Sequence, residues 1–300
     1  MRILTVLTGG TIGSSVRGGV ISPVADLAPM IEDYQKSGAA VFDAVAPYTI
    51  LSENMDAEHL KALRRCIESR MSGYDGVIVT HGTDTLQYTA AYLDLVLGAQ
   101  PVPIVLVSAD YPLEDSRSNG ADNFNAAADF ILGGAERGVF VSYRNRGDGF
   151  VTVHRGSEVL PHAALDDRVF SVFNNYFGTI QNGIFVRNPL YSEPERVDMS
   201  GCELNGRVLF LRPYVGMTYP DIPKDTKAIL FEGWHSGTLP TALKEFRDFC
   251  KTAGERKVPV YLTGSEAGFE YESKLEYESL GINVLPPCSP VYAYMKLFVG

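Results

Sequence analysis

Short apolar segments alternate with longer amphipathic segments through the first half of the chain, and this alternation restricts the fold more than any other feature of the sequence. Four segments have the composition of buried strands: RILTVLT (2–8), YDGVIVTHG (74–82), PVPIVLVSA (101–109) and GVFVSYR (138–144). The segments between them have helical spacing or helix-ending glycines: AEHLKALRRCIESRM (57–71), TLQYTAAYLDLVLG (85–98) and NFNAAADFILGG (123–134). Strands that alternate with helices predict an α/β fold with a large parallel sheet.

The second half repeats this alternation on a smaller scale, from VLFLRPY (208–214) to the terminal YAYMKLFV (292–299). Between the halves, residues 174–201 are rich in Asn, Gly and Pro, a composition typical of a linker. We therefore predict a large N-terminal catalytic domain over residues 1–190 and a smaller C-terminal α/β domain over residues 191–300.

The charge balance bears on the possible partners. The chain has 26 Lys and Arg against 36 Asp and Glu, a formal net charge of -10, which disfavours nucleic acid because phosphate binding requires clustered cations. No apolar run reaches the length that spans a bilayer, so we expect a cytoplasmic protein that does not enter the membrane. The four cysteines and five histidines lack the spacing of metal sites, so we expect no metal.

Two threonine-rich segments follow predicted strands directly. In LTGGTIG (7–13) two glycines allow a sharp turn that presents Thr8 and Thr11, and in THGTDT (80–85) Gly82 precedes a compact polar cluster. Ligands of α/β sheets bind at such strand ends, so both segments are expected to face one pocket. Since a hydroxyl is a poor nucleophile near neutral pH, a threonine enzyme also needs a proton acceptor and donors for the oxyanion.

Each segment alone also fits a structural explanation. TGGT suits a glycine turn before a helix, and Asp84 suits a helix cap. A phosphate-binding loop is disfavoured because neither GKS nor GxGxxG spacing is present.

Taken together, LTGGTIG and THGTDT resemble the two signature segments of the bacterial-type L-asparaginase family. Further similar segments extend the resemblance over most of the chain: SENM (52–55), YPLEDSRSNGADN (111–123), which is similar to the cytoplasmic type I enzymes, HRGSEVLPHAALDDRVFS (154–171), VGMTYPDI (215–222) and GWHSGTLP (233–240). The resemblance implies hydrolysis of the side-chain amide of L-asparagine to L-aspartate and ammonia without a cofactor.

The resemblance also implies roles for individual residues. Thr11 would be the nucleophile, Thr83 the second catalytic threonine, and Asp84 a catalytic residue that also binds the substrate ammonium group. Ser52 and Glu53 would hold the carboxylate and amine of the amino acid, and Thr8 is a further candidate substrate ligand. For Ser52 and Glu53 the alternative is a solvated turn in which Ser52 or Asp56 caps the following helix.

The sequence departs from the family pattern at the lysine that follows the RG element. Pro161 stands where the lysine is expected, and no lysine occurs between Lys61 and Lys224. His162 is one candidate substitute, because an imidazole has a suitable pKa for general base catalysis. Arg155 is another source of positive charge, although it remains protonated and is therefore a poor base.

The loop after the first motif differs as well. Val20 lies near the position of the family's tyrosine, so Ser14, Ser15, Ser22 or a group from elsewhere would have to assist the nucleophile, while Gly18 and Gly19 suit a hinge. Asn119 replaces an aspartate that is usual in the type I segment.

Three functions remain open at this point: an asparaginase-type amidohydrolase, a non-catalytic relative that binds an amino acid, and an amide-hydrolysing subunit that passes ammonia to a partner. The last alternative arises because the SENM and HRG elements also resemble the D-type subunit of the archaeal glutamyl-tRNA amidotransferase. The family further implies a homodimer or homotetramer with the site near a subunit contact. Small-domain candidates for that contact are Trp234, His235, Ser236, Glu270, Glu272 and Glu276.

Overall fold

The computed structural model describes the backbone of residues 1–17, 20–23, 28–36, 38–264 and 273–300. The side chains of residues 15–17, 20–23, 28–30, 33 and 273 lie outside the description. The chain divides into two compact units, Met1–Gly201 and Cys202–Gly300. None of the helices in the described residues is long and apolar enough to cross a membrane.

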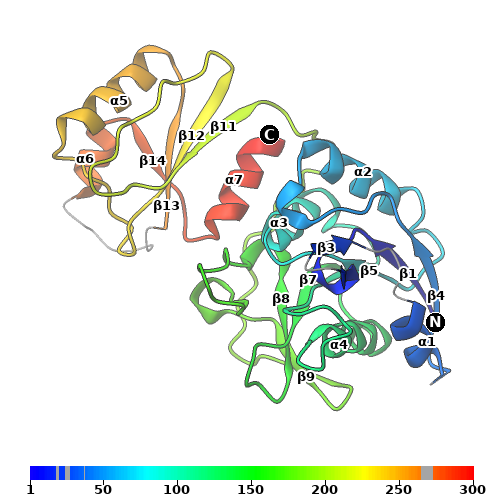
Figure 1. Ribbon diagram of the computed structural model, residues 1–300. Coiled ribbons are helices and arrows are strands. Elements are labelled where there is room, and N and C mark those ends of the chain that lie inside the picture. Colours follow the sequence, from blue (N-terminus) through cyan, green and yellow to red (C-terminus); the bar gives the residue numbers. More distant parts are fainter. Residues whose placement is uncertain (18–19, 24–27, 37, 265–272) are drawn as a thin grey trace. The chain divides into compact units, whose positions relative to one another are not determined.

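The first unit is built on a large sheet whose strand order is β10-β9-β8-β7-β6-β5-β1-β4 (Figure 1). Strands β4, β1, β5, β6 and β7 are parallel, and β8, β9 and β10 continue the sheet antiparallel. The strands are β1 (Arg2–Leu7), β4 (Val41–Val45), β5 (Gly76–Thr80), β6 (Pro103–Val107), β7 (Gly138–Tyr143), β8 (Val151–Arg155), β9 (Gly178–Gln181) and β10 (Ile184–Arg187). The predicted α/β fold with a parallel-dominated sheet is confirmed.

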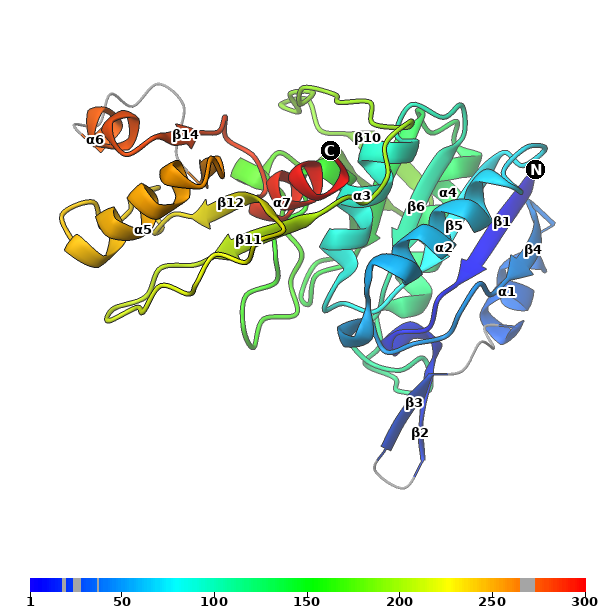
Figure 2. The same cartoon turned by 90° about the horizontal axis from the view of Figure 1, so that it is seen from above.

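Helices lie on both faces of this sheet, with α2 and α3 on one face and α4 on the other (Figure 1). The α-helices are α1 (Ala28–Gln35), α2 (Ala57–Glu68), α3 (Leu86–Leu97) and α4 (Gly120–Leu132). Short 3-10 helices are η1 (Thr11–Gly13), η2 (Ser52–Asn54), η3 (Gly156–Glu158) and η4 (Val172–Asn174). Strands β2 (Ser14–Arg17) and β3 (Val20–Pro23) form a separate ribbon that extends away from the sheet (Figure 2).

Local sequence explains the start and the buried face of α2. The Asp56 side chain accepts a hydrogen bond from the His59 N–H at 2.9 Å, so Asp56 is the N-cap. Leu60, Leu63 and Ile67 follow at helical spacing and are buried. The cap is therefore Asp56 and not Ser52.

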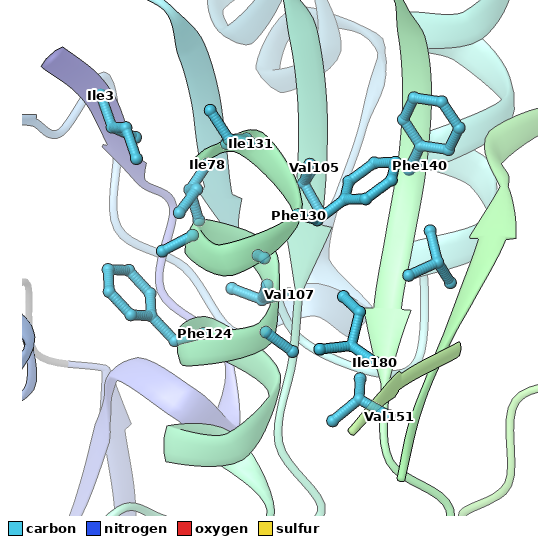
Figure 3. Close-up of a cluster of buried hydrophobic side chains, with 14 of the residues drawn as sticks. Ile3, Ile78, Val105, Val107, Phe124, Phe130, Ile131, Phe140, Val151 and Ile180 are labelled. Atoms are coloured by element: carbon cyan, nitrogen blue, oxygen red, sulfur yellow. The ribbon is translucent and has the colours of Figure 1, made fainter. Parts of the chain in front are cut away.

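The core on the α4 side is drawn in Figure 3. Apolar side chains of the sheet, among them Ile78 and Val105, pack against Phe124, Phe130 and Ile131 of α4. Phe130 meets Phe140 edge to face, with ring centroids 5.0 Å apart. Each of these side chains is fully buried and contributes about 1.5–3 kcal/mol to stability relative to an exposed position.

The interpretation of residues 174–201 as a linker is wrong for part of that segment. Strands β9 and β10 pair antiparallel and extend the large sheet. Asn182 and Gly183 join them with positive φ at both positions (52° and 76°), the geometry of a type I′ hairpin turn. The first compact unit continues to Gly201, beyond the expected boundary at residue 190.

The second unit contains a four-stranded parallel sheet in the order β11-β12-β13-β14. Its strands are β11 (Arg207–Leu211), β12 (Thr226–Glu232), β13 (Val260–Thr263) and β14 (Ile282–Val284), and its helices are α5 (Lys244–Glu255), α6 (Ser273–Ser279) and α7 (Pro290–Val299). Phe231, Phe246 and Phe249 form the centre of its core. The predicted smaller α/β unit is present.

Candidate functional site

The two threonine motifs lie at the point where the large sheet changes its direction of winding. Strands β1 and β5 are adjacent and parallel, with Leu7 opposite Thr80, so both end at the same edge. After β1 the chain continues to β4 on one side, and after β5 it continues to β6 on the other. Loops that diverge in this way leave a crevice at the carboxyl ends of the strands, where α/β proteins bind ligands.

The loop after β1 depends on glycine. Gly9 and Gly10 have φ of 99° and 74°, and the Gly10 N–H donates to the Ile50 carbonyl at 3.0 Å. A Cβ on Gly10 would lie 2.2 Å from the backbone nitrogen of Gly82, so no larger residue fits without displacement of the loops. The two motifs therefore touch through their backbones.

The segment around Ser52 completes the arrangement. A Cβ on Gly82 would lie 2.4 Å from Ser52 Oγ. Thr85 Oγ1 donates to the Ser52 carbonyl at 2.9 Å, and Ser52 Oγ makes a long hydrogen bond of 3.4 Å to Asp84 Oδ2. The structure thus brings Ser52 and Asp84 together.

Thr11 and Thr83 are both half-buried in these loops. Within the described part of the chain, neither hydroxyl has a hydrogen-bond partner, and neither backbone N–H has an acceptor. Asp84 is exposed and does not cap α3, whose N-cap is Thr85 without a side-chain cap bond. The loops therefore offer two free hydroxyls, two free N–H donors and a carboxylate, which are the groups that acyl transfer requires.

The other residues predicted for the site, Thr8, Glu53 and Ser14, differ in burial and in hydrogen bonding. Thr8 is 2% exposed and its hydroxyl donates to the Thr80 carbonyl at 2.6 Å, so it joins β1 to β5 and does not fit the predicted role of substrate ligand. Glu53 is exposed on η2, next to Ser52. Ser14 is buried and its hydroxyl donates to the Gly10 carbonyl at 2.6 Å, which stabilises the glycine turn.

His162 is half-buried and close enough to Asp84 to be influenced by its charge. Burial lowers the pKa of His162, while a hydrogen bond to the backbone of Asp166 and the negative charge of Asp84 act in the opposite direction. Its Nε2 is buried without a hydrogen-bond partner among the described residues. In a neutral ring protonated at Nδ1, this unpartnered Nε2 would have a lone pair that can accept a proton.

Arg155, the other candidate substitute for lysine, lies near the amino ends of the parallel strands, away from the carboxyl ends where the threonine motifs lie. Strand β8 runs antiparallel to β7, and Arg155 pairs with Phe140 near the start of β7. Its guanidinium packs against Gly138, where a Cβ would lie 2.1 Å from Nη1, and its Nε is 3.8 Å from Asp94 Oδ1 near the end of α3. The structure therefore does not bring Arg155 to Thr83, because the direction of β8 carries it to the amino ends of the parallel strands.

Some predicted positions lie outside the described residues. These are Gly18, Gly19, Glu270 and Glu272, together with the side chains of Ser15, Val20 and Ser22. In the second unit, Trp234, His235 and Ser236 follow β12 in a turn closed by the Trp234 N–H and the Thr238 carbonyl at 2.9 Å. Glu276 lies on α6 and pairs with Arg247 at 3.0 Å. No group of three potential metal ligands occurs in the described residues.

The family model for the N-terminal part of asparaginases, described as "Asparaginase, N-terminal", matches residues 2–190. The chain belongs to the asparaginase family. Two curated relatives are, by name, D-type subunits of glutamyl-tRNA(Gln) amidotransferase. The one from Methanosarcina acetivorans is 30% identical, over 87% of this chain and 64% of the relative. The one from Methanobrevibacter smithii is also 30% identical, over 99% of this chain and 71% of the relative. The chain thus spans less than two thirds of the length of the first of these proteins.

Solved structures of the family have the same fold. The thermostable L-asparaginase from Thermococcus kodakarensis superposes with a TM-score of 0.80 at 21% identity, covering 99% of this chain and 92% of that one. A probable cytoplasmic L-asparaginase from Campylobacter jejuni gives 0.75 at 23% identity, covering 99% and 94%. These similarities establish the asparaginase fold.

Two residues that shape the site of this family member, His81 and Gln87, were not predicted from the sequence, whereas Asn119 was predicted only as a departure from the type I segment. His81 lies within the second motif and is fully buried, and Gln87 Nε2 donates to the Asp84 carbonyl at 3.0 Å. Asn119 accepts from the Asp110 N–H at 3.0 Å and donates to the Arg144 carbonyl at 2.8 Å, so the amide uses both of its ends. A histidine within a motif that follows a buried strand was the signal available for His81.

Replacement of Arg155 by methionine is expected to lower the free energy of unfolding by about 3 kcal/mol, because it removes the cation from Asp94, whose side chain is only 11% exposed, and from Glu193. The activity of the folded fraction is expected to be unchanged, since Arg155 is remote from the threonine loops. Urea unfolding and ammonia release measure the two effects. The double variant Arg155→Met/Asp94→Asn should recover most of the stability. A large loss of activity in fully folded Arg155→Met would restore Arg155 as a lysine substitute.

Proposed function

We propose that the chain hydrolyses the side-chain amide of a small α-amino acid, with L-asparagine as the first candidate, to give the acid and ammonia. The observation that carries the proposal is the convergence of the loop of Thr11, the loop of Thr83 and Asp84, and the Ser52 turn at one strand edge. An amino acid requires a counter-charge for its ammonium group, polar contacts for its carboxylate and a nucleophile near its amide. The counter-charge comes from Asp84 and Glu53. Ser52 contacts the carboxylate, and Thr11 is the nucleophile.

The proposed reaction proceeds in two steps. Thr11 Oγ attacks the amide carbon and transfers its proton to a base, and the oxyanion accepts hydrogen bonds from backbone donors such as the Thr83 N–H. The C–N bond breaks as the nitrogen takes up a proton and leaves as ammonia, which leaves an ester on Thr11. Water then attacks the ester, releases the carboxylic acid and returns the proton to Thr11.

His162 is proposed as the base that takes the role of the missing lysine. Its free Nε2 and its position within the influence of the Asp84 charge support this role. A lysine must first lose a proton to act as a base, whereas a neutral imidazole already has its lone pair. Pro161 itself has no side-chain donor or charge.

Replacement of His162 by glutamine is expected to reduce kcat by about a hundredfold, the contribution typical of general base catalysis. Because the pKa of His162 is lowered, wild-type kcat/KM should fall only below the ordinary histidine pKa, and this acid limb should be absent from the variant. His59→Gln is the matched control, since His59 bonds to Asp56 on the surface. An acid limb that persists unchanged in His162→Gln would exclude His162 as the base.

Two alternatives have specific support. Pro161 in place of lysine and Val20 in place of tyrosine favour a protein that binds an amino acid without turnover. The names of the relatives favour an amide-hydrolysing subunit that delivers ammonia to a partner.

The main proposal includes a cytoplasmic homodimer or homotetramer that uses no cofactor, and light scattering tests its oligomeric state.

A single experiment distinguishes these possibilities. Purified protein is incubated with L-asparagine, L-glutamine or D-asparagine, ammonia is measured, and Thr11→Ala serves as the control. Thr11-dependent ammonia from L-asparagine supports the main proposal. Thermal stabilisation by the amino acids without ammonia supports the binding protein. Ammonia that appears only when a partner and its acceptor substrate are added supports the amidotransferase subunit.

A further inference from the structure

His81 lies within the second motif, yet it does not face the crevice. Its side chain is fully enclosed, and its backbone N–H donates to the Val107 carbonyl at 2.8 Å. An enclosed ring does not touch a substrate bound at the strand edge. Any effect of His81 on the reaction must therefore act through the residues that it holds.

The partners of the ring assign its tautomer. Nδ1 lies 2.8 Å from the Gly82 carbonyl oxygen, which only accepts hydrogen bonds, so Nδ1 carries the proton. Nε2 lies 2.8 Å from Thr89 Oγ1 on α3 and accepts the hydroxyl proton. Both nitrogens are satisfied in the neutral ring, and burial lowers the pKa of His81 to about 4 despite the opposing bond to Gly82.

The bond to Gly82 fixes the orientation of the next peptide group. Because a peptide is planar and trans, a Gly82 carbonyl that points toward His81 directs the Thr83 N–H the opposite way. That N–H has no acceptor among the described residues. Gly82 is also confined, since a Cβ there would lie 3.1 Å from Gly10 Cα.

We propose that the hydrogen-bond chain Thr89–His81–Gly82 positions the Gly82–Thr83 peptide, and through it the side chains of Thr83 and Asp84, for reaction. His81 is thus a positioning residue that anchors the motif to α3. This inference rests on the proposed amide hydrolysis at the threonine loops. A small displacement of aligned groups lowers turnover strongly even when the fold persists.

Two substitutions test the hydrogen bonds of the two ring nitrogens of His81 separately. His81→Asn retains a donor near Nδ1 for the Gly82 carbonyl, whereas His81→Gln retains an acceptor near Nε2 for Thr89. If the Gly82 bond positions the motif, His81→Gln should lose at least about tenfold more kcat/KM than His81→Asn, although both leave one buried partner unsatisfied. Equal losses in the two variants, in proportion to their losses of unfolding free energy, would indicate a purely structural role and overturn the proposal.

Thr89 supplies a second comparison. Thr89→Val should lower kcat/KM and Thr89→Ser should restore it, because only the serine retains the hydroxyl. Thr5→Val is the matched control, since Thr5 is equally buried and its hydroxyl has no partner among the described residues. A loss in Thr5→Val as large as that in Thr89→Val would contradict the proposal.

A spectroscopic measurement does not depend on the variants. Imidazole ¹⁵N shifts of wild-type protein should identify His81 as protonated at Nδ1 and unprotonated at Nε2 at neutral pH. The opposite tautomer would overturn the assignment. If the wild-type protein releases no ammonia, the proposed function fails, and the affinity for L-aspartate replaces turnover as the readout. In that case His81→Gln should bind L-aspartate more weakly than His81→Asn does, and equal affinities would count against positioning.

Discussion

Replacement of Thr11 by alanine is expected to lower the rate of ammonia release from L-asparagine by at least about a thousandfold, because the ester on this hydroxyl is the proposed intermediate. The side chain is half-buried and its hydroxyl has no partner within the described residues, so the free energy of unfolding should change by less than about 0.5 kcal/mol. Activity and stability should therefore separate completely at this position. Steady-state ammonia release and urea unfolding measure them on the same preparation.

Thr11→Ser provides the comparison for this result. A serine retains the nucleophilic oxygen, so this variant should keep a measurable fraction of the wild-type rate. Substantial turnover in Thr11→Ala would move the nucleophile elsewhere, with Thr83 as the next candidate, since the Thr83 hydroxyl also has no partner among the described residues.

Replacement of Gly10 by alanine is expected to have the largest structural effect of any single methyl group in the site. The new Cβ would lie 2.2 Å from the Gly82 nitrogen, in contact with backbone that cannot rotate away, and φ at this position is 74°. We expect a loss of more than about 3 kcal/mol in the free energy of unfolding, together with displacement of both threonine loops.

Gly73→Ala is the matched control, because Gly73 also has a positive φ (90°) but no atom lies within 4 Å of the position that an added methyl group would take. This variant should lose only the cost of a left-handed alanine, about 1–2 kcal/mol. The additional loss in Gly10→Ala then combines the contact between the motifs with backbone strain, because φ of 74° and ψ of -175° at Gly10 lie in a region that is almost restricted to glycine. Equal losses would mean that the loops do not touch as described.

Much of the fold follows from the sequence because local and long-range preferences agree. In α2, the Asp56 cap and the stripe of Leu60, Leu63 and Ile67 predict the same helix. Strand β5 is buried on both faces, as its unbroken apolar run predicts. The order of the strands around β1 could not be predicted in this way. It depends on which strands pair with each other, and no local sequence pattern encodes that pairing.

The error over residues 174–201 arose because Asn and Gly were taken as signs of a linker. Here Asn182 and Gly183 form the turn of a hairpin, and the flanking segments GTIQ and IFVR are strands. An NG pair between short segments with β-branched residues was the signal for this hairpin.

For the site, the motifs indicated which loops converge, because strand ends of a parallel sheet share an edge. The two candidate substitutes for lysine were not separable from the sequence. Arg155 and His162 are close in sequence, yet the antiparallel β8 ends at the far edge with Arg155. The chain then reaches the vicinity of Asp84 at His162. Distinguishing them required the direction of one strand.

The proposed function depends above all on the formation of an ester at Thr11. Wild-type protein at steady state with L-asparagine can be quenched in acid, digested and analysed by mass spectrometry. We expect an added aspartyl group on the peptide that contains Thr11, and none on the corresponding peptide of Thr11→Ala. An aspartyl group on the peptide that contains Thr83, or ammonia release by Thr11→Ala at the wild-type rate, would show that Thr11 is not the nucleophile.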